Sequence, residues 1–204
     1  MNDTDRQDIS VENGTGSKSA LAGLSFWILW TLVSAVAAGV SWVLTFLGML
    51  ALYDAFSSAI KHNWWLIAAG PLHGGLQGLA QWLILRRRFR RVHWWIAATA
   101  VWATAWLVLR LMMSELEWIV QSVEAGLVLG IGEWVVLRED LRSVLLIPAA
   151  IVGQLLGEAL AVNFLGGGLL SLTVGEPVLI GVTLGMSTGF VLLALSPQAE
   201  ETPA

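Results

Sequence analysis

Hydrophobic positions follow one another along this chain in long stretches that end at short clusters of charged or polar residues. The clearest stretch is residues 19–53, which contains no charged side chain. A helix of about 17–25 predominantly apolar residues is enough to cross the hydrocarbon core of a bilayer. We therefore predict an all-α membrane protein with six spans, at about residues 21–47, 64–85, 94–113, 118–137, 144–165 and 177–195.

The composition agrees with this class of protein. Of 204 residues, 56% are hydrophobic and 13% are charged, and there is no Cys. Soluble domains carry about 25% charged residues, so a water-soluble enzyme is excluded, as are a disordered chain and a disulfide scaffold. We expect residues 1–19 to be a disordered polar tail, residues 20–195 to be the transmembrane domain and residues 196–204 to be a second polar tail.

The distribution of positive charge predicts the orientation. Cytoplasmic segments of membrane proteins are enriched in Lys and Arg. With both termini in the cytoplasm, the outer loops hold only Lys61, and Arg110 lies just inside the outer end of the third span. This predicts a multi-pass protein of the bacterial cytoplasmic (inner) membrane. The cations assigned to the cytoplasmic side are Arg6, Lys18, Arg86, Arg87, Arg88, Arg90, Arg91, Arg138 and Arg142.

The chain contains twelve tryptophans, a residue that is enriched at membrane–water interfaces. Trp102 and Trp106 lie deeper within the third span, where they must pack between helices or face lipid tails. Most of the others fall near the ends of the predicted spans. We expect the inner interface to be marked by Trp27, Trp30, Trp82, Trp94, Trp95 and Trp134.

An internal repeat is the strongest pattern in the sequence. Residues 74–86 and 126–138 share the pattern G-x-x-x-G-x-x-[QE]-W-x-x-L-R at a constant offset of 52 positions, and residues 181–192 form a degenerate third copy. Units with an even number of spans keep one orientation in the membrane. We predict three repeated helical hairpins, related by a pseudo-threefold axis along the membrane normal.

The repeated pattern also predicts how helices pack. Glycines four residues apart form a groove in which another backbone can approach closely. The Gln or Glu three residues after the second glycine lies on the same face, so it points into the helix contact. The residues of this helix-packing motif are Gly74, Gly78, Gln81, Gly126, Gly130, Glu133, Gly181 and Gly185.

On these segments the chain resembles a group of bacterial multi-pass membrane proteins that carry repeated GxxxGxxQWLVLR segments and a terminal GxxxGxxTG segment. The resemblance covers residues 74–88, 126–138 and 181–192, and so three of the six predicted spans. It departs at Glu133, where that group has Gln. The resemblance implies a fold and no particular activity.

Polar side chains inside the spans are the candidates for function, because an ionisable residue at that depth costs about 2.5–3.5 kcal/mol on insertion scales. In a functional interpretation they line a polar path and bind a small solute or a cation. In a structural interpretation they hydrogen-bond neighbouring helices, with the Glu side chains neutral. The candidate ligand- or ion-binding residues are Glu124, Glu158, Gln154, His73, Gln77, Gln121 and Arg110.

Three functional hypotheses follow. The leading one is a protein that binds or translocates a small solute or cation along a polar seam between helices. The alternative is an accessory subunit whose G-x-x-x-G faces dock onto a larger complex, pigment-bearing or energy-converting, or onto further copies of the chain. A substrate-binding component of a vitamin uptake system is similar in size and span number only.

Other sequence features argue against enzymes and nucleic-acid binding. There is no H-E-x-x-H, no Cys ligand, no G-x-S-x-G elbow, and no Asp inside a span that could act as a nucleophile. The Arg run at residues 86–91 adjoins a span directly, which favours contact with lipid phosphates over nucleic acid. We predict no catalytic residues and no metal site, and the sequence identifies no cofactor.

Overall fold

The computed structural model describes residues 3–56, 64–89, 92–112, 117–165 and 174–195. The described residues are all-α, with six α-helices, as the hydrophobic pattern predicted. Two short 3₁₀ helices, η1 (Val92–Trp94) and η2 (Leu141–Leu145), precede the third and fifth. The α-helices are α1 (Asp3–Phe56), α2 (Trp64–Leu85), α3 (Trp95–Met112), α4 (Trp118–Leu137), α5 (Leu146–Phe164) and α6 (Glu176–Leu195).

The molecule is a multi-pass membrane protein by the length and hydropathy of its helices. α2 is the described helix that falls short of the hydropathy needed for a span, since its interior holds His73, Gln77 and Gln81 among several glycines. The five segments long and apolar enough to cross a membrane are Ala20–Gly48, Val92–Leu109, Trp118–Leu137, Leu141–Phe164 and Glu176–Leu195.

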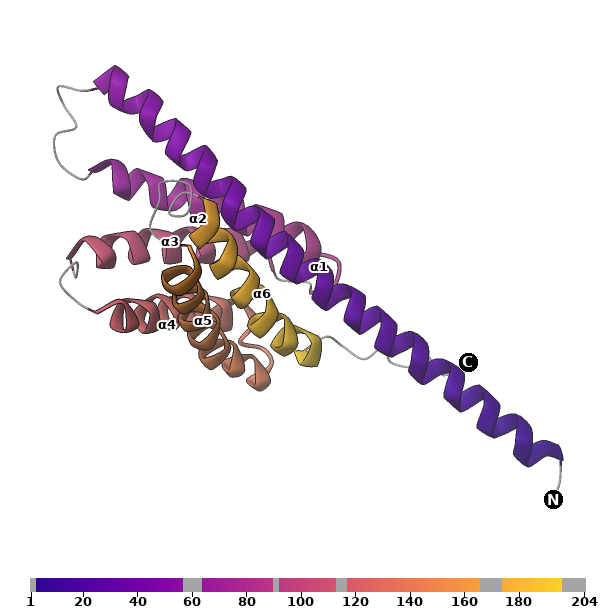
Figure 1. The fold of residues 1–204 in the computed structure, drawn as a ribbon. Coiled ribbons are helices and arrows are strands. Elements are labelled where there is room, and N and C mark those ends of the chain that lie inside the picture. Colours follow the sequence, from indigo (N-terminus) through magenta and orange to yellow (C-terminus); the bar gives the residue numbers. More distant parts are fainter. Residues whose placement is uncertain (1–2, 57–63, 90–91, 113–116, 166–173, 196–204) are drawn as a thin grey trace.

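The start of α1 differs from the sequence-based expectation. The helix begins at Asp3, whereas residues 1–19 were expected to form a tail without structure. Residues 3–19 contain no proline to break the helix. The polar segment therefore extends the first span beyond the bundle (Figure 1). Residues 196–204 lie outside the described part of the chain.

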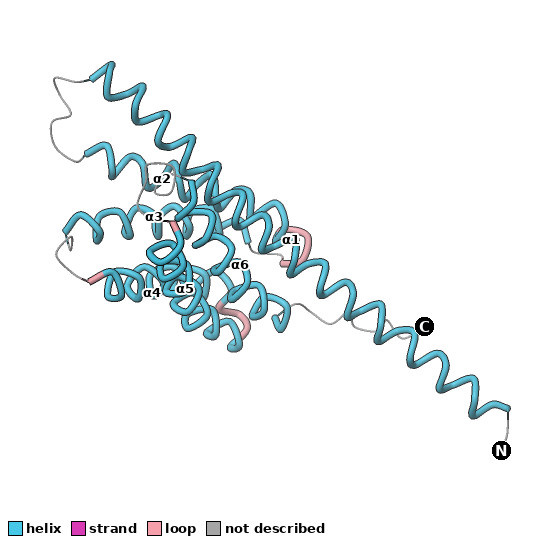
Figure 2. Tube along the Cα trace, viewed as in Figure 1, coloured by secondary structure: helices cyan, strands magenta, loops and turns pink. Residues whose placement is uncertain are grey.

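The helices form a ring. Each helix contacts its neighbour along the chain, and α6 contacts α1 extensively. Figures 1 and 2 show α1 and α6 side by side, although they come from opposite ends of the sequence. The contact between α1 and α6 therefore closes the ring of helices.

Glycines of the repeated pattern lie at the tightest contacts of this ring. A Cβ on Gly74 of α2 would collide with the Thr99 carbonyl oxygen of α3. A Cβ on Gly126 of α4 would lie 2.5 Å from Ile151 Cα of α5, and one on Gly181 of α6 would lie 2.8 Å from Ala35 Cα of α1. Each glycine groove thus holds the backbone of the helix that follows it in the ring.

The partners of these grooves differ from the predicted hairpins. We expected the pairs of each unit to be the first and second, third and fourth, and fifth and sixth spans. The grooves of the repeated pattern instead join α2 to α3, α4 to α5, and α6 to α1. The predicted pair of the fifth and sixth spans is also in close contact, because Gly153 and Gly157 of α5 lie against α6. The glycine pattern of a helix predicts which face packs closely against another helix. It does not predict which neighbouring helix packs there, because that depends on the arrangement of the whole bundle.

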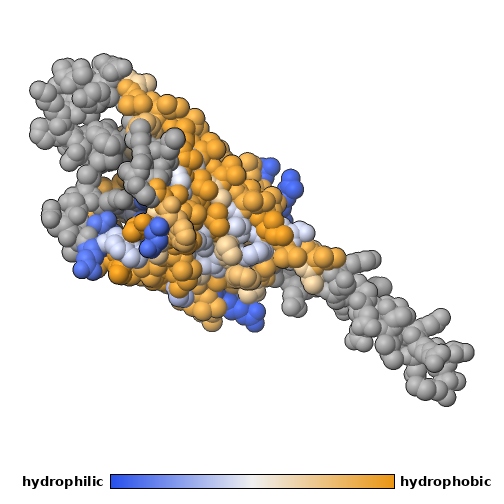
Figure 3. Space-filling view, in the orientation of Figure 1, coloured by the Kyte–Doolittle hydropathy of each residue, from blue (hydrophilic) through white to orange (hydrophobic). Residues whose placement is uncertain are grey.

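The outer surface of the bundle is apolar. Figure 3 shows hydrophobic residues covering the visible face, with hydrophilic residues gathered toward the ends of the helices. On α1 the exposed positions are large aliphatic residues, including Leu21 and Val36, each 62% exposed. A surface of this kind is stable against acyl chains and not in water, which agrees with a bilayer around the bundle.

Candidate functional site

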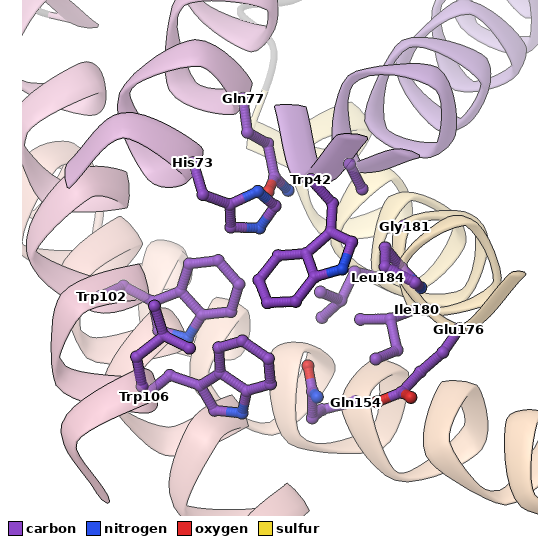
Figure 4. A pocket seen from close by; sticks show the side chains of 13 residues that line it. Trp42, His73, Gln77, Trp102, Trp106, Gln154, Glu176, Ile180, Gly181 and Leu184 are labelled. Atoms are coloured by element: carbon purple, nitrogen blue, oxygen red, sulfur yellow. The ribbon is translucent and has the colours of Figure 1, made fainter. Parts of the chain in front are cut away.

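A cavity of about 310 Å³ lies between α1, α2, α3, α5 and α6. Figure 4 shows side chains from these helices pointing into a common space. Three of the residues expected from the sequence meet here, namely His73, Gln77 and Gln154. Four further residues complete the polar and aromatic wall: Trp42, Trp102, Trp106 and Glu176.

Two amide side chains give the cavity hydrogen-bond acceptors without partners. Gln77 of α2 is 4% exposed and Gln154 of α5 is 1% exposed. The Oε1 atom of each is buried and accepts no hydrogen bond from any residue that the structure describes. The Gln154 amide is held in place because its Nε2 donates to Glu158 Oε1 at 3.3 Å. A buried acceptor without a donor is costly, and so these atoms favour a ligand or a water that donates to them.

His73 adds a third acceptor. Its Nδ1 lies 2.8 Å from Ser41 Oγ of α1, and the Ser41 hydroxyl also lies within bonding distance of the Ala38 carbonyl oxygen, at 3.1 Å. Ser41 has one hydroxyl proton, so both bonds form together only if that proton goes to Ala38 and His73 Nδ1–H donates to Ser41. In this tautomer the Nε2 atom of the neutral ring is a hydrogen-bond acceptor.

Three tryptophans form an aromatic part of the cavity wall. The ring centroids of Trp42 and Trp106 are 6.1 Å apart at an interplanar angle of 65°, and those of Trp102 and Trp106 are 6.4 Å apart at 17°. Trp102 is fixed by an indole N–H donated to the Ala125 carbonyl oxygen of α4, at 2.9 Å. The two deep tryptophans of the third span thus pack between helices. Figure 4 shows Trp42, Trp102 and Trp106 around one space.

Glu176 and Trp42 were not among the residues that the sequence pattern selected. Glu176 lines the cavity from the first turn of α6, where the sequence indicated only a favourable helix start. Trp42 lies on a span without charge, so nothing near it marks a polar site.

The carboxyl groups that were expected to share a seam lie in different surroundings. Glu158 is buried and bonds Gln154 behind the cavity wall. Glu124 and Gln121 of α4 line a separate small recess, together with Trp106, whose ring also borders the main cavity. The side chain of Arg110 lies outside the described side chains.

A layer of hydrogen-bonded aromatic residues lies next to the cavity. It is on the side of the bundle where α3 begins and α6 ends. Trp95 Nε1 donates to Gln81 Oε1 at 3.0 Å, and Gln81 Nε2 donates to Ser34 Oγ at 3.2 Å. Trp30 Nε1 donates to Thr188 Oγ1 at 3.1 Å, and the rings of Trp30 and Trp95 meet edge to face at 5.9 Å. These contacts tie α1, α2, α3 and α6 together.

This layer corrects one expectation. Trp30 and Trp95 were predicted to mark the inner membrane interface, but they are 0% and 1% exposed. Their neighbours Leu85, Leu146 and Leu192 are also fully buried. Interfacial tryptophans need contact with headgroups. Trp30 and Trp95 therefore belong to the core of the bundle.

Glu133 occupies in α4 the place that Gln81 has in α2, but the two side chains differ in their hydrogen bonds. Glu133 is 5% exposed, and its buried Oε2 accepts no hydrogen bond from the described residues. A buried carboxyl without a partner destabilises a fold, whereas a paired amide does not. The difference yields a direct prediction.

We expect Gln81→Leu and Glu133→Leu to have opposite effects. Gln81→Leu leaves the Trp95 indole without its acceptor and should cost about 1–3 kcal/mol. Glu133→Leu removes an unpaired polar atom and should leave stability unchanged or increase it. The measurement is the free energy of unfolding of each purified variant in the same detergent. An equal loss in both variants would show that Glu133 has a partner in the folded protein.

In comparisons with protein-family models, curated proteins and solved structures, nothing matched this chain. The proposals that follow rest on the geometry and chemistry of the cavity.

Proposed function

We propose that the protein binds a small solute in the central cavity. The observation that carries this proposal is that the cavity wall includes two buried amide side chains, Gln77 and Gln154, whose Oε1 atoms accept no hydrogen bond from the described residues. Binding sites for small molecules are mostly apolar cavities of about 300–1,000 Å³ with a few convergent polar groups. The cavity has this size and this chemistry, and it collects three residues whose polarity would otherwise be a cost within a membrane.

In this proposal the solute enters from the outer side. Both termini lie in the cytoplasm of a bacterial cell, as the cation distribution indicates, so α6 begins at the outer face of the cytoplasmic membrane. Glu176 in the first turn of α6 stands at that end of the cavity. The Trp30–Trp95 layer closes the other end. Release to the cytoplasm, and so translocation, requires this layer to open.

We also propose that the ring is built from three copies of one unit. Each unit consists of a helix with the glycine pattern and the helix that follows it around the ring. The support is that Gly74, Gly126 and Gly181 occupy matching positions and make the same kind of backbone contact. In two units an indole N–H also bonds the matching polar residue, Gln81 in one and Thr188 in the other.

The accessory-subunit hypothesis loses its main motivation. The G-x-x-x-G faces that would dock onto another protein are filled within the chain, since Gly126 and Gly130 lie against α5, and Gly181 and Gly185 lie against α1. A face already in contact with a backbone cannot accept a second one. The solute-binding proposal is therefore the one that we develop.

The test uses the absence of Cys from the chain, which makes any introduced thiol unique. Ala38 lines the cavity, so Ala38→Cys should react with 2-(trimethylammonium)ethyl methanethiosulfonate added outside intact cells. Two control variants should react at least about tenfold more slowly, because a thiol in a helix contact or in lipid does not form the reactive thiolate. These are Ala35→Cys, a buried position that does not line the cavity, and the surface variant Val101→Cys.

Two other outcomes would contradict parts of this proposal. If Ala38→Cys reacts no faster than Ala35→Cys, water does not reach the cavity from outside, and the proposed function is wrong. If Ala38→Cys reacts only in inverted vesicles, the orientation is reversed.

A further inference from the structure

We propose that the cavity selects a small aromatic molecule that carries hydrogen-bond donors, hydroxyl or N–H, at two opposite edges. This inference rests on the proposed function, because it names the ligand class of the same cavity. It combines the aromatic part of the wall with acceptors that face the cavity from two sides of the ring of helices.

The two amide acceptors lie on opposite sides of the ring of helices. Gln77 belongs to α2 and Gln154 to α5, and these helices stand across from each other in a ring of six that follows the chain order. Figure 4 shows both side chains at the cavity, with the Trp42 ring between them. Neither Oε1 atom accepts a hydrogen bond from the part of the chain that the structure describes. A ligand that satisfies both acceptors across the cavity carries donors at two separated positions.

His73 adds an acceptor on the α2 side. It precedes Gln77 by four residues, about one helical turn, and both side chains line the cavity. In the tautomer set by Ser41, the Nε2 atom of His73 accepts a hydrogen bond. From α5 the cavity receives the single polar side chain of Gln154. A ligand with acceptors alone, such as an ether, would leave these atoms without donors.

The tryptophans favour an aromatic body for the ligand. Trp102 and Trp106 of α3 are nearly parallel, at 17°, whereas Trp42 of α1 meets Trp106 at 65°. An aromatic ring can stack against one indole and meet another edge to face, and both arrangements are preferred by ring pairs. Trp42 is itself oriented by the His73 ring, which it meets edge to face with centroids 5.3 Å apart. A saturated ring of the same size gains from burial but not from these ring contacts.

The size and the remaining lining of the cavity favour a small ligand. Its volume of about 310 Å³ is at the lower end of the range for small-molecule sites, about 300–1,000 Å³. Leu107, Ile180 and Leu184 complete the wall, and such side chains contact hydrocarbon better than they contact water. This favours a single aromatic ring with short substituents over a sugar, which is hydrated over its whole surface.

The test uses four uncharged probes built on one para-substituted ring. 1,4-Benzenedimethanol (the diol) carries two hydroxyl donors, 4-(methoxymethyl)benzyl alcohol (the monoether) carries one, and 1,4-bis(methoxymethyl)benzene (the diether) carries none. The fourth probe, trans-1,4-cyclohexanedimethanol, keeps both donors on a saturated ring. Binding to the full chain in lipid nanodiscs is measured by isothermal titration calorimetry. We expect each lost donor to raise the Kd at least about fivefold, and the saturated ring to raise it about threefold.

Two variants locate the contacts. Gln154→Met removes the acceptor on the α5 side, so the monoether should bind within about twofold of the diol, while the diether should remain at least about fivefold weaker. Trp42→Leu should reduce the preference for the aromatic diol over the saturated diol to less than about twofold. The melting temperature of each variant is first compared with that of the parent protein, so that loss of folding is recognised.

Thr45→Val is the matched control. The Thr45 hydroxyl of α1 is also buried and has no hydrogen-bond partner among the described residues, but Thr45 does not line the cavity. Valine has nearly the same shape as threonine. If the preference for donors arises at the cavity wall, this variant should keep all the Kd ratios of the parent protein.

The other outcomes separate this inference from the proposed function. If the diether or the saturated diol binds the parent protein as tightly as the aromatic diol, the ligand class is wrong while the solute cavity stands. The same holds if Gln154→Met keeps the preference of the parent for the diol over the monoether. If the diol does not bind but Ala38→Cys still reacts from outside, the inference again fails alone. If the diol does not bind and Ala38→Cys is also unreactive, both proposals fail.

Discussion

Trp95→Ala is expected to destabilise the protein by about 3–5 kcal/mol, the range for truncating a buried tryptophan. Trp95 is 1% exposed, meets Trp30 edge to face, and donates its indole N–H to Gln81. The substitution opens a void in the layer next to the cavity and leaves Gln81 Oε1 without a donor. The free energy of unfolding in detergent, followed by chemical denaturation, measures the loss.

Trp94→Ala is the matched control. Trp94 adjoins Trp95 in the sequence but is 64% exposed. A surface substitution usually changes stability by less than about 0.5 kcal/mol. Equal losses in the two variants would place Trp95 at the membrane interface, where the sequence alone had placed it. A Trp95→Phe variant should fall between the parent and Trp95→Ala, because it keeps a ring in the layer but loses the N–H donor.

Gly74→Ala is the second substitution with a large expected effect. The added methyl group would overlap the Thr99 carbonyl oxygen and lie 2.7 Å from Ala103 Cβ, so α2 and α3 must separate. Overpacking of this kind costs about 1–3 kcal/mol. A wider gap between these helices also moves His73 and Gln77 relative to Trp102 and so disturbs the cavity. We expect a lower melting temperature and a changed rate of thiol labelling when the substitution is combined with Ala38→Cys.

Gly75→Ala separates the effect of packing from that of helix propensity. Gly75 is the next residue of the same helix, and a Cβ there would meet no atom within 4 Å. Alanine is favoured over glycine in a helix by about 1 kcal/mol, so Gly75→Ala should be neutral or stabilising. If Gly74→Ala proved equally harmless, the close approach of α2 to α3 would be incorrect.

The spans were predictable because a bilayer of fixed thickness requires apolar stretches of fixed length. The start of α4 at Trp118 and the extent of α2 agree with the pattern of hydrophobic residues. However, the position of a residue along a span does not show toward which side of the helix its side chain points. Trp30 and Trp95 have the depth of interfacial residues, but their side chains turn into the bundle.

The sequence could identify only those residues of the candidate site that are polar within an apolar span. His73, Gln77 and Gln154 are conspicuous because each is polar within an apolar span. Trp42 and Glu176 are not, since an indole is expected in a membrane protein and an acid is expected in the first turn of a helix. Their role depends on the approach of α1 and α6, which are far apart in the sequence.

The contact between α1 and α6 has a consequence for biosynthesis. Ribosomes deliver α1 to the membrane before α6, so the groove of Gly181 and Gly185 reaches its partner only after the helices between them have been made. Until then, the small-residue face of α1 that α6 later covers is exposed to lipid. The cavity is therefore completed only when α6 has been inserted, and nascent chains that stop before α6 cannot form it.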